Sequence, residues 1–244
     1  MYRSPLLITY GNFVFKYRDK LFPATLIVLL ILFPPPAPDE GSGVDLISAV
    51  SSLVVALAGE MLRVLTVGLE YIKRGGLNKQ VYASSLVTNG LFAHCRNPLY
   101  VGNVLIALGL LSIADRLALF LIGAVLTFIT YIAIVAAEED FLRRTFGAEF
   151  EAYCARVHRW LPDFHGFGAT LKSMRFNWRR VALKESSSFY GWIVSAVLIE
   201  GVGIRFQPSL MMRPDALLFI GLFVAGTLAF VTIRILKQTR ALEA

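Results

Sequence analysis

Apolar residues in this 244-residue chain are gathered into six segments that are separated by polar stretches. None of these segments alternates apolar and polar positions as a strand of a membrane barrel does, so helices are the expected spanning form. A helix needs about 20 mostly apolar residues to cross a bilayer. The pattern therefore predicts an all-α integral membrane protein with about six transmembrane helices. The predicted spans are Leu21–Pro34, Val44–Leu69, Leu99–Ala114, Leu117–Ala137, Phe189–Ile204 and Ala216–Leu236.

The third and fourth spans are predicted to form a tight helical hairpin. Only Ser112–Arg116 separates them, which is enough for a turn between antiparallel helices. Gly102 and Gly109 lie two turns apart on one face of the third span, where a neighbouring helix can approach closely. Beyond the hairpin, Phe141–Val157 has apolar residues at three- and four-residue spacing on both sides of Gly147. That spacing predicts a cytoplasmic helix-turn-helix at the membrane surface.

Composition and charge add an orientation to this picture. Hydrophobic residues make up 56% of the chain and charged residues 17%, whereas an ordinary soluble domain has about 25% charged residues. Arginine and lysine are concentrated before the first and third spans and after the fourth and sixth. The opposite side holds only Arg116, Arg205 and Arg213. The positive-inside rule then places both termini and the two long connections in the cytoplasm.

The net charge of +7 follows mainly from this topology. It also favours contact with anionic phospholipid headgroups. Nucleic acid is a poor alternative partner, because no basic stripe accompanies a recognisable reading module.

Two polar stretches at the ends of the hairpin carry the candidate chemistry. Arg96 and Pro98 precede Tyr100 at the entry to the third span, where the free amides of the first helical turn attract a carboxylate. Arg96 can bind such a group with two hydrogen bonds, and Tyr100 can donate another. At the far end of the hairpin, Glu138 and Glu139 are placed to accept from a ribose diol or to face a cation. Taken singly, each of these residues is more typical of a headgroup anchor, an interfacial aromatic or a solvated helix end.

As an ordered set, these residues resemble the family of isoprenylcysteine carboxyl methyltransferases and phospholipid methyltransferases, which are integral membrane proteins. The family has an Arg-His-Pro-x-Tyr-x-Gly element, a helical hairpin and a Glu-Glu element that ends in Arg-x-x-Pro. The resemblance covers roughly residues 50–163, with Asn97 where the family has its histidine. The matching residues are Gly90, Arg96, Pro98, Tyr100, Gly102, Glu138, Glu139, Leu142, Phe146, Gly147, Tyr153, Val157, Arg159 and Pro162.

The resemblance implies transfer of a methyl group from S-adenosyl-L-methionine to a membrane lipid or lipidated acceptor at the cytoplasmic leaflet. His94 is included among the expected cofactor ligands as a nearby imidazole, and no metal ligand is expected. The residues implied in catalysis are Glu139, Arg156 and Arg159. The residues implied in cofactor binding are His94, Arg96, Asn97, Pro98, Tyr100, Gly102, Glu138, Glu139, Tyr153, Arg159, Trp160 and Pro162.

The resemblance also suggests a division of the chain into four parts. Residues 1–43 form an N-terminal arm, the first span and an outer loop. Residues 44–163 form the methyltransferase core with the cofactor motifs. Residues 164–188 form a basic cytoplasmic connector, and residues 189–244 hold two C-terminal spans and a tail.

Two other classes of protein stay open at this point. A nicotinamide-dependent membrane reductase of the sterol-reductase type would share a membrane hairpin, although the sequence has no glycine-rich dinucleotide fingerprint. A non-enzymatic membrane protein, such as a channel or transporter subunit, would place functional polar residues in the middle of the membrane. Within the methyltransferase class, the sequence does not decide between a carboxylate and an amine as the acceptor.

Overall fold

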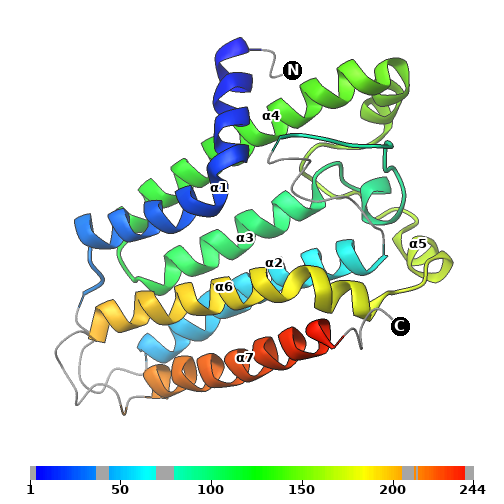
Figure 1. Cartoon of the computed structure of the whole chain (residues 1–244). Helices are drawn as coiled ribbons and strands as arrows, with labels where there is room; N and C mark the ends of the chain where they lie inside the picture. The colour runs from blue at the N-terminus through cyan, green and yellow to red at the C-terminus, as the bar shows by residue number, and fades with distance from the viewer. Residues whose placement is uncertain (1–3, 37–43, 70–79, 205–211, 213, 240–244) are drawn as a thin grey trace.

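The computed structural model describes residues 4–36, 44–69, 80–204, 212 and 214–239. Within these residues the chain forms seven α-helices and one 3-10 turn, and no strand is present among them. The predicted all-α architecture is confirmed (Figure 1). The elements are α1 (Pro5–Leu32), α2 (Val44–Leu69), η1 (Gly90–Ala93), α3 (Pro98–Ile113), α4 (Leu117–Arg156), α5 (Phe167–Ser173), α6 (Trp178–Ile204) and α7 (Pro214–Gln238).

Three helices are long and apolar enough to cross a membrane, namely α2 over Leu46–Leu69, α4 and α7. Helix α3 is apolar but only 16 residues long. The described parts of α1 and α6 do not meet the same combination of length and composition. An integral membrane protein is therefore supported, and the count of six spans stays a prediction.

Two helices begin earlier than the apolar pattern indicates. Helix α1 begins at Pro5 rather than near Leu21, and α6 begins at Trp178 rather than near Phe189. In the added part of α1, Val14 is buried in a cluster with residues of α4. Apolar content alone marks the part of a helix that suits lipid, and it misses a part that is stabilised by contacts with other helices.

The hairpin is confirmed, because α3 ends at Ile113 and α4 begins at Leu117. Asp115 in the turn has a φ of 44°, a left-handed conformation that aspartate tolerates better than most residues. At its other end α4 continues to Arg156 as a single element, interrupted where Gly147 has φ 52° and ψ −120°. The structure therefore has a kink at Gly147 inside α4, and the cytoplasmic helix-turn-helix stays a prediction.

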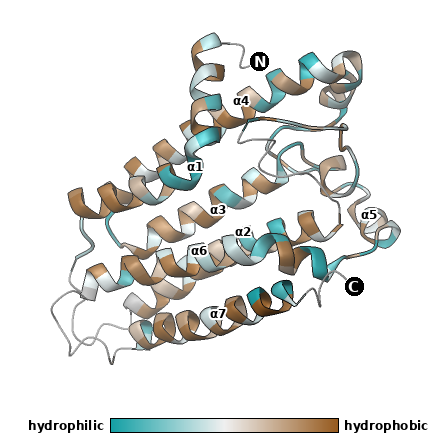
Figure 2. Cartoon of the chain, in the orientation of Figure 1, coloured by the Kyte–Doolittle hydropathy of each residue, from teal (hydrophilic) through white to brown (hydrophobic). Residues whose placement is uncertain are grey.

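Packing between the helices is dominated by three pairs. Helix α2 lies mainly against α3, α1 against α4, and α6 against α7. The largest buried core joins α1, α2, α3, α4, α6 and α7, with Leu53, Leu119, Ile199 and Phe219 among its members. Hydrophobic residues dominate most of the length of these helices, and hydrophilic residues gather towards the end where α5 lies (Figure 2).

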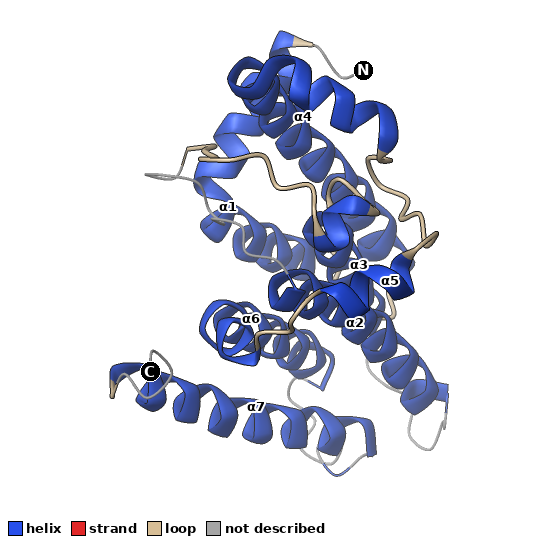
Figure 3. Cartoon of the chain, turned by 90° about the vertical axis from the view of Figure 1, so that its right-hand side faces the viewer, coloured by secondary structure: helices blue, strands red, loops and turns tan. Residues whose placement is uncertain are grey.

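The helices alternate in direction, so that the polar motifs meet at one end of the bundle. The C-terminal ends of α2 and α4 and the N-terminal ends of α3 and α6 lie on the same side (Figure 1). Seen from that side, α5 and several loops cover the ends of these helices (Figure 3). The outermost terminal residues, with Arg205 and Arg213, lie outside the described residues, so the orientation in the membrane stays a prediction.

The close approach of α2 and α3 can be tested by a substitution at Gly109 on α3. A Cβ atom at this position would lie 2.7 Å from the backbone nitrogen of Ala56 and 2.7 Å from the carbonyl oxygen of Ser52. We expect Gly109→Ala to lower the free energy of unfolding by about 1–3 kcal/mol, because backbone atoms must move apart. The measurement is denaturant titration of the detergent-solubilised protein.

Gly221→Ala is the matched control, since a Cβ atom on Gly221 in α7 would have no heavy atom within 4 Å. Alanine there should be neutral or mildly stabilising, because it is the better helix former. Equal stability of the two variants would contradict the close packing of α2 on α3.

Candidate functional site

The two polar stretches that flank the hairpin lie side by side. The backbone N–H of Arg96 donates to the carbonyl of His158 at 2.9 Å, and the backbone N–H of Asp163 donates to the carbonyl of His94 at 2.9 Å. These two bonds join the loop before α3 to the segment after α4. The predicted convergence of the two stretches at one end of the bundle is therefore what the structure shows.

Asn97 and Cys95 strengthen the same junction. The side-chain amide of Asn97 donates to the carbonyl of Arg159 at 3.1 Å, and the Cys95 thiol lies 3.5 Å from the carbonyl of Trp160. Burial raises the pKa of the Cys95 thiol, so the thiol keeps the proton that it donates. Asn97, where the family has histidine, thus uses its donor to hold the two segments together.

Glu139 near the end of the apolar part of α4 is held by two arginines. The Nε and Nη2 atoms of Arg159 lie 2.8 Å and 2.6 Å from its two carboxylate oxygens, a bidentate pair. Arg96 Nη1 lies 3.2 Å from Glu139 Oε1. Glu139 is only 6% exposed. One buried carboxylate therefore fixes an arginine from each motif.

Arg96 keeps a donor that this arrangement does not use. Its Nη1 also donates to the Cys154 sulfur at 2.7 Å. Its Nε is buried and has no hydrogen-bond partner among the described residues. Two guanidinium groups beside one carboxylate leave an excess of positive charge at this point. An unused donor and a positive charge together suit an anionic group such as a carboxylate.

Glu138 occupies a different environment from its neighbour. The Tyr100 hydroxyl donates to Glu138 Oε1 at 2.5 Å. The Tyr100 ring lies 5.5 Å from the Tyr131 ring, measured between centroids. Trp160 packs against the same apolar cluster, which also contains Phe15 of α1. Glu138 is therefore a carboxylate beside aromatic side chains, and within the described part of the chain no arginine forms a hydrogen bond with it.

His94 and Tyr153 are used in holding the fold around the site. His94 Nδ1 donates to the carbonyl of Asp163 at 2.6 Å, and Nε2 lies 2.8 Å from the Thr170 hydroxyl. Because both ring nitrogens have partners in the protein, the imidazole is tied to the α5 segment. The Tyr153 hydroxyl donates to the carbonyl of Phe92 at 2.7 Å and so anchors η1.

The remaining predicted site residues form no hydrogen bond with the Glu139 ion pairs within the part of the chain that the structure describes. Pro98 is buried in the first turn of α3, as the sequence predicts. Gly102 faces α2, where a Cβ atom would lie 2.7 Å from the side chain of Arg63. Pro162 is partly buried in the segment after α4. Arg156 is exposed at the end of α4 and forms no ion pair with another residue that the structure describes.

Sequence reasoning missed a second buried polar group next to Gly102. Arg63 on α2 donates to the side-chain oxygen of Asn103 on α3. It also donates to Glu185 on α6 at 2.6 Å. The available signal was the presence of Glu60 and Arg63 one turn apart within the largely apolar second span. Glu185 gave none, because it lies in the stretch predicted to be a connector.

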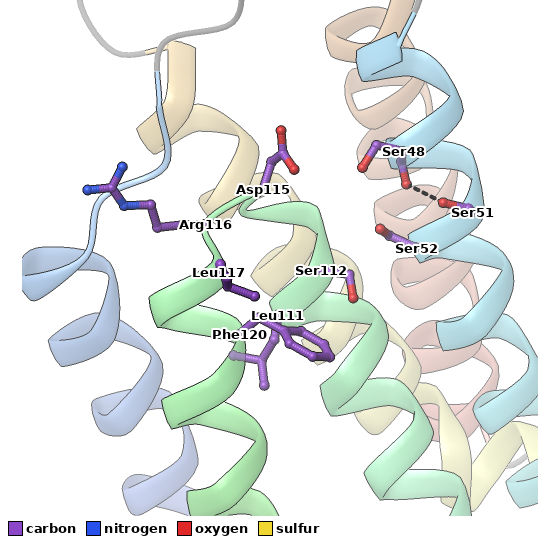
Figure 4. A pocket seen from close by; sticks show the side chains of 9 residues that line it. All are labelled: Ser48, Ser51, Ser52, Leu111, Ser112, Asp115, Arg116, Leu117 and Phe120. Carbon is purple, nitrogen blue, oxygen red and sulfur yellow. Dashed lines mark hydrogen bonds between the residues drawn. The ribbon is translucent and has the colours of Figure 1, made fainter.

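A separate pocket of about 320 Å³ lies at the opposite end of the hairpin (Figure 4). Serine side chains from α2 line one side of it, and residues around the α3–α4 turn line the other. It contains none of the predicted site residues. The lining residues are Ser48, Ser51, Ser52, Leu111, Ser112, Asp115, Arg116, Leu117 and Phe120.

Comparison with known proteins supports the resemblance for part of the chain. The phospholipid methyltransferase family model matches residues 51–149. This stretch includes most of α2, the loop before α3, the hairpin and both glutamates, and it ends before Arg159 and Pro162 of the second motif. No solved structure matches the chain significantly.

Two curated proteins are similar to about a third of this chain. One is the cobalt-zinc-cadmium resistance protein CzcN of Cupriavidus metallidurans, 37% identical over 79 residues, which are 32% of this chain and 36% of that protein. The other is the nickel-cobalt-cadmium resistance protein NccN of Alcaligenes xylosoxydans xylosoxydans, 34% identical over 80 residues, which are 33% of this chain and 37% of that protein. The chain thus spans little more than a third of the length of these relatives. Among the described residues there is no group of three or more potential metal-ligating side chains.

The ion pairs of Glu139 lead to a stability prediction. We expect Glu139→Gln to lower the free energy of unfolding by about 3 kcal/mol, because the two partly buried guanidinium groups lose their shared carboxylate. Glu149→Gln is the control, since Glu149 is an exposed glutamate of the same helix. The measurement is thermal or denaturant unfolding in detergent. A loss no larger than that of the control would show that the two arginines do not depend on Glu139.

Proposed function

We propose that this protein is an S-adenosyl-L-methionine-dependent methyltransferase that acts on a membrane lipid or a lipidated acceptor at the cytoplasmic face of the membrane. The observation that supports this most directly is Arg96. It belongs to the matched family region, it is largely buried beside a second arginine, and its Nε has no partner among the described residues. A site of this kind suits the carboxylate of an amino-acid group.

The neighbouring residues fit the rest of such a cofactor. Arg96 would hold its carboxylate. Glu138, with the Tyr100 hydroxyl, would accept from its amino group or its ribose. Trp160 and the aromatic cluster around Tyr131 supply an apolar surface for an adenine ring. When bound, the cofactor supplies an electrophilic methyl group on a sulfonium ion.

The contribution of the chain to methyl transfer is mainly alignment and the exclusion of water. The Glu139 ion pairs fix Arg96 and Arg159, and the hydrogen bonds of Asn97 and His94 hold the segments that carry them. Both carboxylate oxygens of Glu139 are already occupied by guanidinium groups. We therefore assign to Glu138 the removal of a proton from an amine acceptor, where the acceptor is an amine.

We assign to Arg156 the contact with a charged acceptor. It is exposed at the end of α4, a short distance along the chain from the bidentate Arg159–Glu139 pair. A guanidinium in that position can orient a carboxylate or a phosphate with two hydrogen bonds. This assignment applies equally to a lipid headgroup and to a lipidated carboxylate.

The cofactor is tested by calorimetric titration of the detergent-purified protein with S-adenosylhomocysteine. We expect the wild type to bind and Arg96→Gln to lose at least about tenfold in affinity, which corresponds to the loss of one charge-assisted contact. Arg144→Gln is the control, because Arg144 is an exposed arginine of α4 that pairs with Asp140 one turn away. It should bind as the wild type does.

Absence of binding by a well-folded wild type would contradict the proposal. NADPH is titrated in parallel, and binding of NADPH in place of S-adenosylhomocysteine would favour the membrane reductase class. Equal losses in both arginine variants would show that Arg96 has no special role.

A further inference from the structure

Helix α6 lies outside the matched family region, yet it supplies a buried charge to the core. Glu185 is 2% exposed, and its Oε2 accepts from Arg63 Nη2 at 2.6 Å. Arg63 is also buried, and its Nε lies 3.8 Å from Glu60 one turn earlier on α2. A C-terminal helix is thus joined by charge to a helix of the family region.

Stability alone is a weak explanation for this pair. Removing two charges from water costs as much free energy as their attraction returns, and apolar side chains of similar volume often serve at least as well. Charged residues among apolar helices of a membrane protein are therefore commonly retained for function. The guanidinium of Arg63 holds side chains of two other helices, Asn103 of α3 and Glu185 of α6.

From Arg63 a continuous set of contacts leads to the candidate site. Arg63 donates to the side-chain oxygen of Asn103, the residue after Gly102 on α3. The side chain of Asn103 lies near the Tyr131 hydroxyl on α4, close enough to interact with it. The Tyr131 ring contacts the Tyr100 ring, and Tyr100 donates to Glu138. Each link joins a different pair of side chains, and together they cross α6, α2, α3 and α4.

The close approach of α2 and α3 makes this set of contacts stiff. Gly102 has no side chain, and a Cβ atom there would lie 2.7 Å from both Arg63 Cγ and the carbonyl oxygen of Gly59. The stem of Arg63 therefore lies directly on the backbone of α3. A shift of the guanidinium cannot be absorbed by empty space, so it displaces the side of α3 that carries Asn103.

We propose that Glu185 is a positioning residue: through Arg63 and Asn103 it fixes α3 and Tyr131 so that Tyr100 and Glu138 are held ready for the cofactor. This makes α6 part of the working unit, although the family match ends before it. The proposal rests on the proposed function for its link to the cofactor. Its structural part concerns the placement of Tyr100 and is tested without any ligand.

The first test is the affinity of the full chain for S-adenosylhomocysteine. We expect Glu185→Gln to weaken binding about tenfold, the usual size of coupling between connected sites. Glu151→Gln is the matched control, because Glu151 also accepts from an arginine, Arg143, but lies outside this set of contacts. The control should bind as the wild type does. Wild-type affinity of Glu185→Gln would overturn the proposal.

A double-mutant cycle with Tyr100→Phe tests whether Glu185 acts through Tyr100. We expect the losses to be non-additive, so that the double variant binds little worse than the weaker of the two single variants. Losses that multiply would mean that the two residues act independently, and they would overturn the proposed route.

An uncharged replacement separates positioning from stability. The variant Glu60→Gln, Arg63→Met and Glu185→Leu removes all three charges of this buried cluster, so it leaves no buried charge unpaired and should fold with about the stability of the wild type. We expect it nevertheless to bind S-adenosylhomocysteine about tenfold more weakly, because Asn103 has lost its donor. A stable triple variant with wild-type affinity would show that the cluster is only structural.

Hydrogen exchange of the ligand-free protein gives a result that does not depend on the cofactor. Peptides covering residues 98–104 should exchange faster in Glu185→Gln than in Glu151→Gln. If the wild type fails to bind S-adenosylhomocysteine, the proposed function is wrong, and this comparison alone decides the positioning role. Equal exchange in the two variants would overturn it.

Discussion

The interaction on which the site depends is the buried carboxylate of Glu139 between Arg159 and Arg96. The two arginines come from segments that are separated by the whole α3–α4 hairpin. Neither segment has regular secondary structure that would hold it in place. A guanidinium with a bidentate partner has one preferred orientation, so the ion pairs with Glu139 fix the positions of the two loops that carry Arg96 and Arg159. The hydrogen bonds of Asn97 and the backbone contacts of His94 then close the junction from the side.

A second buried arginine lies deeper along the same bundle. Arg63 joins α2 to Asn103 of α3 and to Glu185 of α6, and Gly102 provides the room for its side chain. Both sites use arginine, whose planar donors can bind two partners at once, where a lysine ammonium offers a single point charge. Beyond Asn103, the rings of Tyr131 and Tyr100 lead to Glu138, the residue before Glu139 on α4. The helices of an apolar bundle are thereby kept in a single register at the end where the chemistry is proposed.

Much of this arrangement was predictable from local pattern. Continuous apolar runs predict helices, the short Ser112–Arg116 stretch predicts the hairpin, and the spacing of the motif residues indicates the methyltransferase family. The roles of individual residues were less accessible. The two glutamates are neighbours in the sequence, yet Glu139 meets two arginines and Glu138 meets a tyrosine. Successive residues of a helix point about 100° apart, so their partners are set by whichever segment packs on each face.

The sequence by itself determined the helical architecture, the hairpin and the resemblance to the phospholipid methyltransferase family over residues 51–149, because each depends on composition and spacing within a continuous stretch of chain. Tertiary structure alone decided where α1 and α6 begin, since charged stretches become helical there through contacts with other helices. It also decided that His94 is tied to the α5 segment and that Glu185 meets Arg63. Such contacts join residues that are far apart in sequence. Their geometry follows from how whole helices pack, which no local pattern contains.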